Sequence, residues 1–268
     1  MVLVDYGDIS KDVEKGYDII GNLDNILREI ENNRIGLLDT EKILNRGGID
    51  RPTYDTIRDE ILEDTCRKFI EYIDVLEDAE DILKKLKVIY TKMILELDNY
   101  RKGKVVFMQK ADEYTLLRLR TKELKENIDK LSEQIENMSI DTAFFVLECF
   151  TEKALALNYL RYISKVLLFA QKIGDKWSEE RIKLENKISE LERKIEKLNE
   201  KLEEVGIRYS LGEFGQMEYD ERRIKLENQI ESLTETMEKL ERKLEENDSF
   251  FLRIFEKLEE LQKMYKGE

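Results

Sequence analysis

"RIKLENKISELERKIEKLNEKLEE" (181–204) returns 42 residues later as "RIKLENQIESLTETMEKLERKLEE" (223–246), and the two copies are identical at 15 of 24 positions. Each copy carries a seam, meaning a row of apolar residues that are alternately four and three positions apart. A spacing that averages 3.5 residues is typical of coiled-coil helices. The second seam continues in phase beyond its copy as far as Tyr265. The repeat therefore predicts two long helices that pack through their seams.

The segment between the copies, "VGIRYSLGEFGQMEYDER" (205–222), contains Gly206, Gly212 and Gly215. Each glycine costs a helix interior about 1 kcal/mol, so three of them close together favour a turn. We therefore expect an antiparallel helical hairpin with its tip near 206–217. The alternative is one continuous helix over 181–246, because an offset of 42 residues is six heptads and keeps the two seams in phase.

A second segment, "RGGIDRPTYD" (46–55), aligns without gaps on "LGEFGQMEYD" (211–220). In this alignment Gly47 matches Gly212, and the Tyr-Asp pair ends both segments. Asp50 and Pro52 are suited to the start of a helix. The sequence thus predicts the same kind of turn at two places, each followed by a long helix.

The tip sequence "IRYSLGEFGQMEYDERRIKLE" resembles the SHOCT motif, a short helical hairpin in which a Gly-x-Ile turn precedes an aromatic residue and a charged helix. The resemblance spans about 205–226 and is weaker at 44–61. Phe214 stands where the motif usually has Ile, and Gly215 where it usually has Ser or Thr. The resemblance implies a hairpin tip used for association, and it implies no catalysis.

Composition supports an all-α chain that is elongated. Of its 268 residues 40% are charged, and there is a single proline. Long helices and coiled coils have this composition. We expect short helices, interrupted by Gly7, Gly16 and Gly21, and a turn over 1–52. A more compact long-helix bundle follows over 53–175; it begins with a helix at 53–101 and includes an apolar helix at 142–172, which Gly174 ends. An antiparallel coiled-coil hairpin is expected over 176–268.

The residue types argue against most active sites. Histidine is absent, which removes the commonest acid–base group and metal ligand. Cys66 and Cys149 are 83 residues apart and form no CxxC pattern, so they predict no zinc or redox site. No phosphate-binding loop occurs. We expect no catalytic residue, no cofactor, no metal and no small-molecule substrate, and we expect that the chain is not an enzyme.

The same features bear on location. The N-terminus lacks a signal-peptide pattern, and no stretch approaches the ~20 uncharged apolar residues of a membrane span. Two cysteines without a disulfide framework favour a reducing compartment. The sequence predicts a cytoplasmic protein.

Charge is distributed unevenly. Residues 84–125 carry 12 Lys and Arg against 5 Asp and Glu, whereas residues 1–83 carry 10 against 22. The basic stretch favours an acidic protein partner, with another copy's N-terminal region as one candidate. The alternative is a nucleic acid or an anionic membrane surface, with "KVVFMQK" (104–110) as a docking element. The residues expected to contribute are Lys84, Lys85, Lys87, Arg118, Arg120 and Lys122.

The end of the second seam has no counterpart in the first copy, which stops at Val205. Left uncovered, it forms an apolar stripe that soluble monomers avoid. We expect either the helix at 142–172 or a second chain to cover it, and we favour the second chain, in a homodimer whose register Asn247 helps to set. The stripe consists of Phe251, Ile254, Leu258, Leu261 and Tyr265.

Together these observations predict a non-catalytic scaffold, adaptor or structural subunit that works through protein–protein association. Its partner is either a second copy or another protein. The runner-up is a nucleic-acid or anionic-surface binder that uses 84–125.

Overall fold

The computed structural model describes residues 6–101, 111–135 and 137–267, and within these residues it contains helices and no strand. The predicted all-α fold is confirmed. The expected docking element at 104–110 lies outside the described residues. The helices are α1 (Tyr6–Asn45), α2 (Arg51–Arg101), α3 (Ala111–Ile135), α4 (Ile140–Lys153), the 3₁₀ helix η2 (Leu160–Tyr162), α5 (Ile163–Ser210) and α6 (Gln216–Lys266).

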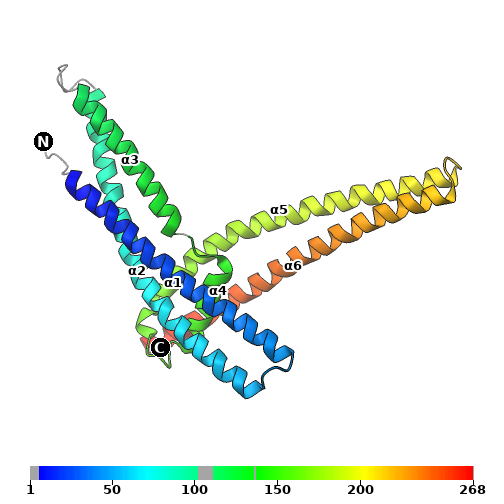
Figure 1. Cartoon of the computed structure of the whole chain (residues 1–268), viewed down its shortest axis with the longest axis horizontal. Coiled ribbons are helices and arrows are strands. Elements are labelled where there is room, and N and C mark those ends of the chain that lie inside the picture. Colours follow the sequence, from blue (N-terminus) through cyan, green and yellow to red (C-terminus); the bar gives the residue numbers. More distant parts are fainter. Residues whose placement is uncertain (1–5, 102–110, 136, 268) are drawn as a thin grey trace. The chain divides into compact units, whose positions relative to one another are not determined.

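The chain divides into two compact units, Met1–Val166 and Leu167–Glu268, where the sequence indicated three parts. In the first unit α1 and α2 run antiparallel, and α3 returns along the C-terminal half of α2 (Figure 1). Asn33 on α1 donates a hydrogen bond to Asp64 on α2 over 2.8 Å. Apolar side chains of all three helices, among them Leu86 and Leu131, form a common core.

The N-terminal segment differs from its prediction, because α1 is one helix of 40 residues and not a set of short ones. Its glycines were taken for breaks. Gly16 is instead buried against α3, and an added Cβ would lie 3.2 Å from Leu131. This glycine therefore lets α1 approach its neighbours closely while the helix continues.

The expected apolar helix at 142–172 is also wrong. Ser139 caps α4 by accepting a hydrogen bond from the Thr142 backbone N–H, but α4 ends at Lys153. Asn158 then adopts a left-handed backbone with φ of 59°, which asparagine tolerates better than most residues. A new helix, α5, begins at Ile163 and continues through Gly174, which had been expected to end it.

In the second unit α5 and α6 lie side by side and antiparallel, joined by a short turn (Figure 1). The Trp177 indole N–H donates to Asp248 over 2.8 Å, and Arg181 pairs with the same carboxylate at 3.2 Å. Because α5 ends at Ser210 and α6 starts at Gln216, the alternative of one continuous helix over 181–246 is excluded.

The two turns that were aligned in sequence have the same backbone structure. Gly47 and Gly212 are both left-handed, with φ of 71° and 78°. In each turn the glycine N–H and the following N–H bond to the carbonyls three and five residues earlier, which is the Schellman ending of a helix. The chain thus ends α1 and α5 in the same way.

Candidate interaction surfaces

The apolar stripe of α6 is largely covered within the single chain. Ile254, Leu258 and Leu261 are 2%, 0% and 8% exposed, whereas Phe251 is half-buried and Tyr265 is exposed. The expectation of a bare stripe that needs a second chain is therefore wrong for its three buried members.

Part of this difference follows from where α5 begins. The prediction started the hairpin at 176, but α5 already runs from Ile163, so it extends past the first copy of the repeat. Phe251 lies against Gly174 of this extension, where an added Cβ would come within 2.7 Å of the ring. The glycine that looked like a helix end is thus a contact site for α6.

The structure brings the predicted basic residues to one end of the first unit, where α2 and α3 lie alongside each other (Figure 1). Three of them already have acidic neighbours in the same chain. Lys85 pairs with Asp12 of α1 at 2.7 Å. Lys84 pairs with Asp81 at 3.0 Å, and Lys122 lies 3.6 Å from Glu126. Part of the positive charge is therefore neutralised within the chain.

The other three basic residues differ in exposure. Lys87 and Arg118 are exposed, and Arg120 is half-buried. Arg120 lines a pocket of about 270 Å³ between α1, α2 and α3, together with Ile9, Ser10, Val13, Met93, Glu123, Leu124 and Asn127. The pocket mixes apolar walls with one cation and one carboxylate, so it defines no ligand class.

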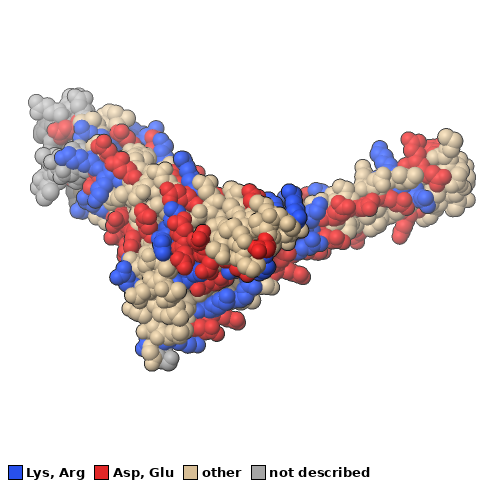
Figure 2. Space-filling view, turned by 60° about the horizontal axis from the view of Figure 1, so that its bottom comes forward, with Lys and Arg blue, Asp and Glu red and all other residues tan. Residues whose placement is uncertain are grey.

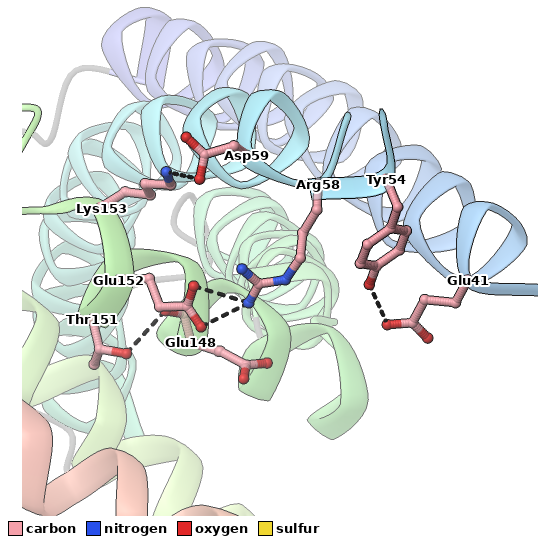
Figure 3. Close-up of polar contacts among 8 residues, drawn as sticks. All are labelled: Glu41, Tyr54, Arg58, Asp59, Glu148, Thr151, Glu152 and Lys153. Carbon is pink, nitrogen blue, oxygen red and sulfur yellow. Dashed lines mark hydrogen bonds and ion pairs between the residues drawn. The ribbon is translucent and has the colours of Figure 1, made fainter. Parts of the chain in front are cut away.

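A polar cluster that the sequence did not reveal joins α4 to α2 (Figure 3). Arg58 donates hydrogen bonds to both carboxylate oxygens of Glu152 over 2.9 Å. The next residues on the two helices, Lys153 and Asp59, form an ion pair. These partners are 94 residues apart in sequence, so no local pattern indicates them. Charge-assisted hydrogen bonds of this kind fix the orientation of two helices.

Beside this cluster, the Tyr54 hydroxyl donates to Glu41 over 3.0 Å. Burial, followed by the hydrogen bond to Glu41, raises the pKa of Tyr54, which makes it a poorer acid near neutral pH. Among the described residues, no group of three or more Cys, Asp and Glu side chains is arranged to hold a metal ion. What the cluster does chemically is bind α4 to α2.

The turn between α5 and α6, hereafter the tip (residues 207–223), is held by contacts among its own aromatic and charged side chains. The rings of Tyr209 and Tyr219 stack with centroids 4.4 Å apart, and Phe214 lies against Tyr209 at 6.4 Å. Arg222 covers the Phe214 ring at 4.9 Å, a cation–π distance. The aromatic residues, which are half-buried, therefore form the small interior of the tip.

Three apolar side chains of the tip are exposed. Ile207, Leu211 and Met217 are 61%, 71% and 88% exposed. Figure 2 shows uncharged surface at the end of the α5–α6 pair beside both acidic and basic side chains. Sequence reasoning found this turn but not its exposed apolar residues, because the heptad pattern stops at the glycines and says nothing about which side chains face outward.

The equivalent turn between α1 and α2 provides an internal comparison. In the gapless alignment, Ile207 corresponds to Lys42, Leu211 to Arg46 and Met217 to Pro52, and these three counterparts are also exposed. The same backbone turn is therefore built without apolar side chains at two of these positions. The exposed Ile207 and Leu211 are not needed to form the turn.

Comparisons of the chain with protein-family models, with curated proteins and with solved structures give no match. No described helix has the length and apolar character required to cross a membrane.

Proposed function

We propose that this protein is a non-catalytic helical scaffold or adaptor that acts through protein–protein association, with the tip of the α5–α6 pair as its contact element. The observation that carries the proposal is the set of exposed apolar residues on the tip. Exposed apolar side chains that a fold does not need are typical of interaction sites. A tip whose side chains already contact one another loses less conformational entropy when it binds than a free loop does.

Photo-cross-linking in the native cell tests this proposal, with a photoreactive phenylalanine analogue in place of Leu211 and, as matched control, in place of Arg46. Both positions follow the last helical turn before a left-handed glycine, so they differ in neighbours and not in backbone. We expect protein adducts from Leu211 and few from Arg46. Equal or absent cross-linking at the two positions would contradict the proposal.

The second candidate is binding to a nucleic acid or an anionic membrane surface through the basic end. It is favoured by the outward face of α2, where Val88 and Leu95 are exposed beside Lys84 and Lys92. Binding of this kind weakens steeply with salt. Salt-sensitive binding of the purified chain to anionic vesicles or to RNA, in place of a protein adduct at Leu211, would select this candidate.

A further inference from the structure

Resting on the proposed function, we infer that the surface on which the tip docks is the basic face of α2 in a second copy of this chain. The contact is between molecules: the tip of one copy lies on residues 84–95 of another. The argument rests on the chemistry of the two surfaces.

The tip needs a partner that is both apolar and basic. The tip, residues 207–223, carries three basic side chains, Arg208, Arg222 and Arg223, against four acidic ones, and two more acidic residues, Glu203 and Glu204, precede it. Arg208 is held by Glu213 at 2.7 Å and Arg222 by Glu218 at 2.6 Å. Two of the three arginines are thus engaged within the tip, and Arg223 lies 3.8 Å from Glu227 beyond it, whereas Glu203 and Glu221 are exposed. An acidic surface is repelled by a second tip and attracted by cations.

A surface of the required kind lies on α2. Lys84, Val88 and Leu95 are spaced by four and seven residues, so they share one face of the helix, and all three are exposed. At 100° per residue, Lys87 and Lys92 fall on opposite flanks of this face. Two exposed apolar residues lie between three lysines, of which Lys84 is already paired with Asp81, and this face matches the apolar and acidic groups of the tip.

The charge of α2 changes along its length in a way that fits this contact. Its first part, residues 55–81, carries 11 Asp and Glu against 3 Lys and Arg, whereas residues 84–95 carry four Lys and no acidic residue. An acidic tip is therefore directed to one end of the helix. Such a contact joins two different patches, so repeated contacts give closed rings, of which a two-copy ring is the smallest, or open chains.

Sedimentation velocity of the full chain tests the inference, from about 5 to 200 µM, a range that brackets a weak micromolar affinity. We expect the average mass to rise with concentration, and to rise less at about 0.5 M than at about 0.05 M salt, because charge attraction is screened. A wild-type chain that stays monomeric at every concentration would overturn the inference.

The tip variant is Ile207→Lys with Leu211→Arg, which places the residues of the α1–α2 turn at the equivalent positions, so the turn is expected to fold. It should weaken self-association by more than about tenfold. The matched control, Ile182→Lys with Leu252→Lys, makes the same change of charge at exposed isoleucine and leucine side chains of α5 and α6 that lie outside the tip. Equal weakening by the control would count against a specific tip contact. Helix content and Trp177 fluorescence report whether each variant is folded.

The reciprocal variant, Lys84→Glu with Lys87→Glu and Lys92→Glu, reverses the basic face and should also prevent self-association. An equimolar mixture of the two variants then pairs a basic tip with an acidic face, and an acidic tip with a basic face. We expect the mixture to associate although neither variant does so alone. If the mixture stays monomeric, or if reversing the lysines has no effect, the α2 face is not the docking site.

These outcomes separate the two proposals. A monomeric chain that still yields an adduct with a different protein at Leu211 in cells refutes docking on a second copy and keeps the association function. A chain that self-associates through the tip while Leu211 yields adducts only with further copies supports both.

Discussion

Gly212→Ala is expected to destabilise the α5–α6 pair through its backbone alone. The residue has φ of 78°, and an added Cβ would meet no atom within 4 Å, so no clash contributes. A left-handed conformation costs an L-residue about 1–2 kcal/mol. Alanine also reduces the freedom of the unfolded chain, which offsets about 0.4–1 kcal/mol. The free energy of unfolding should therefore fall by about 1 kcal/mol.

Gly206→Ala is the matched control, and it should act in the opposite direction. Gly206 lies inside α5 and also has open space where a Cβ would be placed. Alanine in a helix interior is favoured over glycine by about 1 kcal/mol. The same chemical change at sites six residues apart should thus separate the two stabilities by about 2 kcal/mol.

Urea denaturation followed by tryptophan fluorescence measures both effects. Trp177 is the single tryptophan, is 3% exposed and donates its N–H to Asp248 of α6, so its emission reports the packing of these two helices. Transition midpoints that shift in the same direction for the two variants would refute the reasoning from backbone conformation. So would a Gly212→Ala variant that is as stable as the wild type.

Three further predictions concern buried contacts. Gly174→Val should lower the midpoint of the same fluorescence transition, because its side chain would overlap the ring that now lies 2.7 Å from the Cβ position; an unchanged midpoint would contradict this close contact. Asp59→Asn should destabilise the chain more than Lys153→Met, by roughly 1–3 kcal/mol, because it leaves the mostly buried ammonium of Lys153 without its carboxylate; the reverse order in thermal melts would show that the pair is solvated. The two buried thiols should resist alkylation at pH 8 until the chain is unfolded, because burial raises the pKa of Cys66 to about 12 and that of Cys149 well above its usual value; fast labelling of the native chain would disprove this.

The sequence predicted those parts of the fold that depend on local patterns. The second long helix was expected over 53–101 and runs from Arg51 to Arg101, because Asp50 accepts a hydrogen bond from the Thr53 N–H at its start. Both turns were found from their glycines, since a left-handed residue after a helix is a strong and local requirement.

The incorrect predictions of helix boundaries concern positions where contacts between residues distant in sequence determine the structure. Gly16 and Gly174 looked like helix ends, but each is a place where another helix approaches, by way of Leu131 and Phe251. No single-sequence rule distinguishes a glycine that ends a helix from one that accommodates a neighbour. The interruption near Asn158 was missed for a related reason, because apolar residues on both sides of it continue the helical pattern.

Of the two candidate surfaces, one could be predicted from the sequence and the other could not. The basic end was predictable, because charge is counted along the chain, and α2 and α3 bring its two halves together. The apolar tip was not, since exposure of Leu211 or Met217 depends on the direction in which a turn presents its side chains. Burial of Ile254 and Leu258 could not be predicted either, because it depended on where α5 begins.

The register of α5 against α6 gives a structural reason for the sequence repeat. The Trp177–Asp248 and Tyr209–Gln216 hydrogen bonds both place residue i opposite residue 425 − i, so residues 181–204 lie opposite 221–244. That range matches the second copy of the repeat to within two residues. Each copy therefore lies opposite the reverse of the other, as two identical subunits would about a two-fold axis.

A self-complementary seam does not by itself fix the register of the two helices. If α6 is shifted along α5 by one heptad, apolar seam residues again lie opposite apolar seam residues. The contacts that prevent a slip must involve at least one residue outside the repeat. Asp248, which accepts from Trp177 and pairs with Arg181, has Gly206 as its counterpart 42 residues earlier, so this polar contact occurs once. Next to it, the Asn247 side-chain nitrogen is buried and has no hydrogen-bond partner among the described residues, a cost that apolar seam positions do not carry. The unique polar contact at one end and the short turn at the other together hold the two copies in a single register.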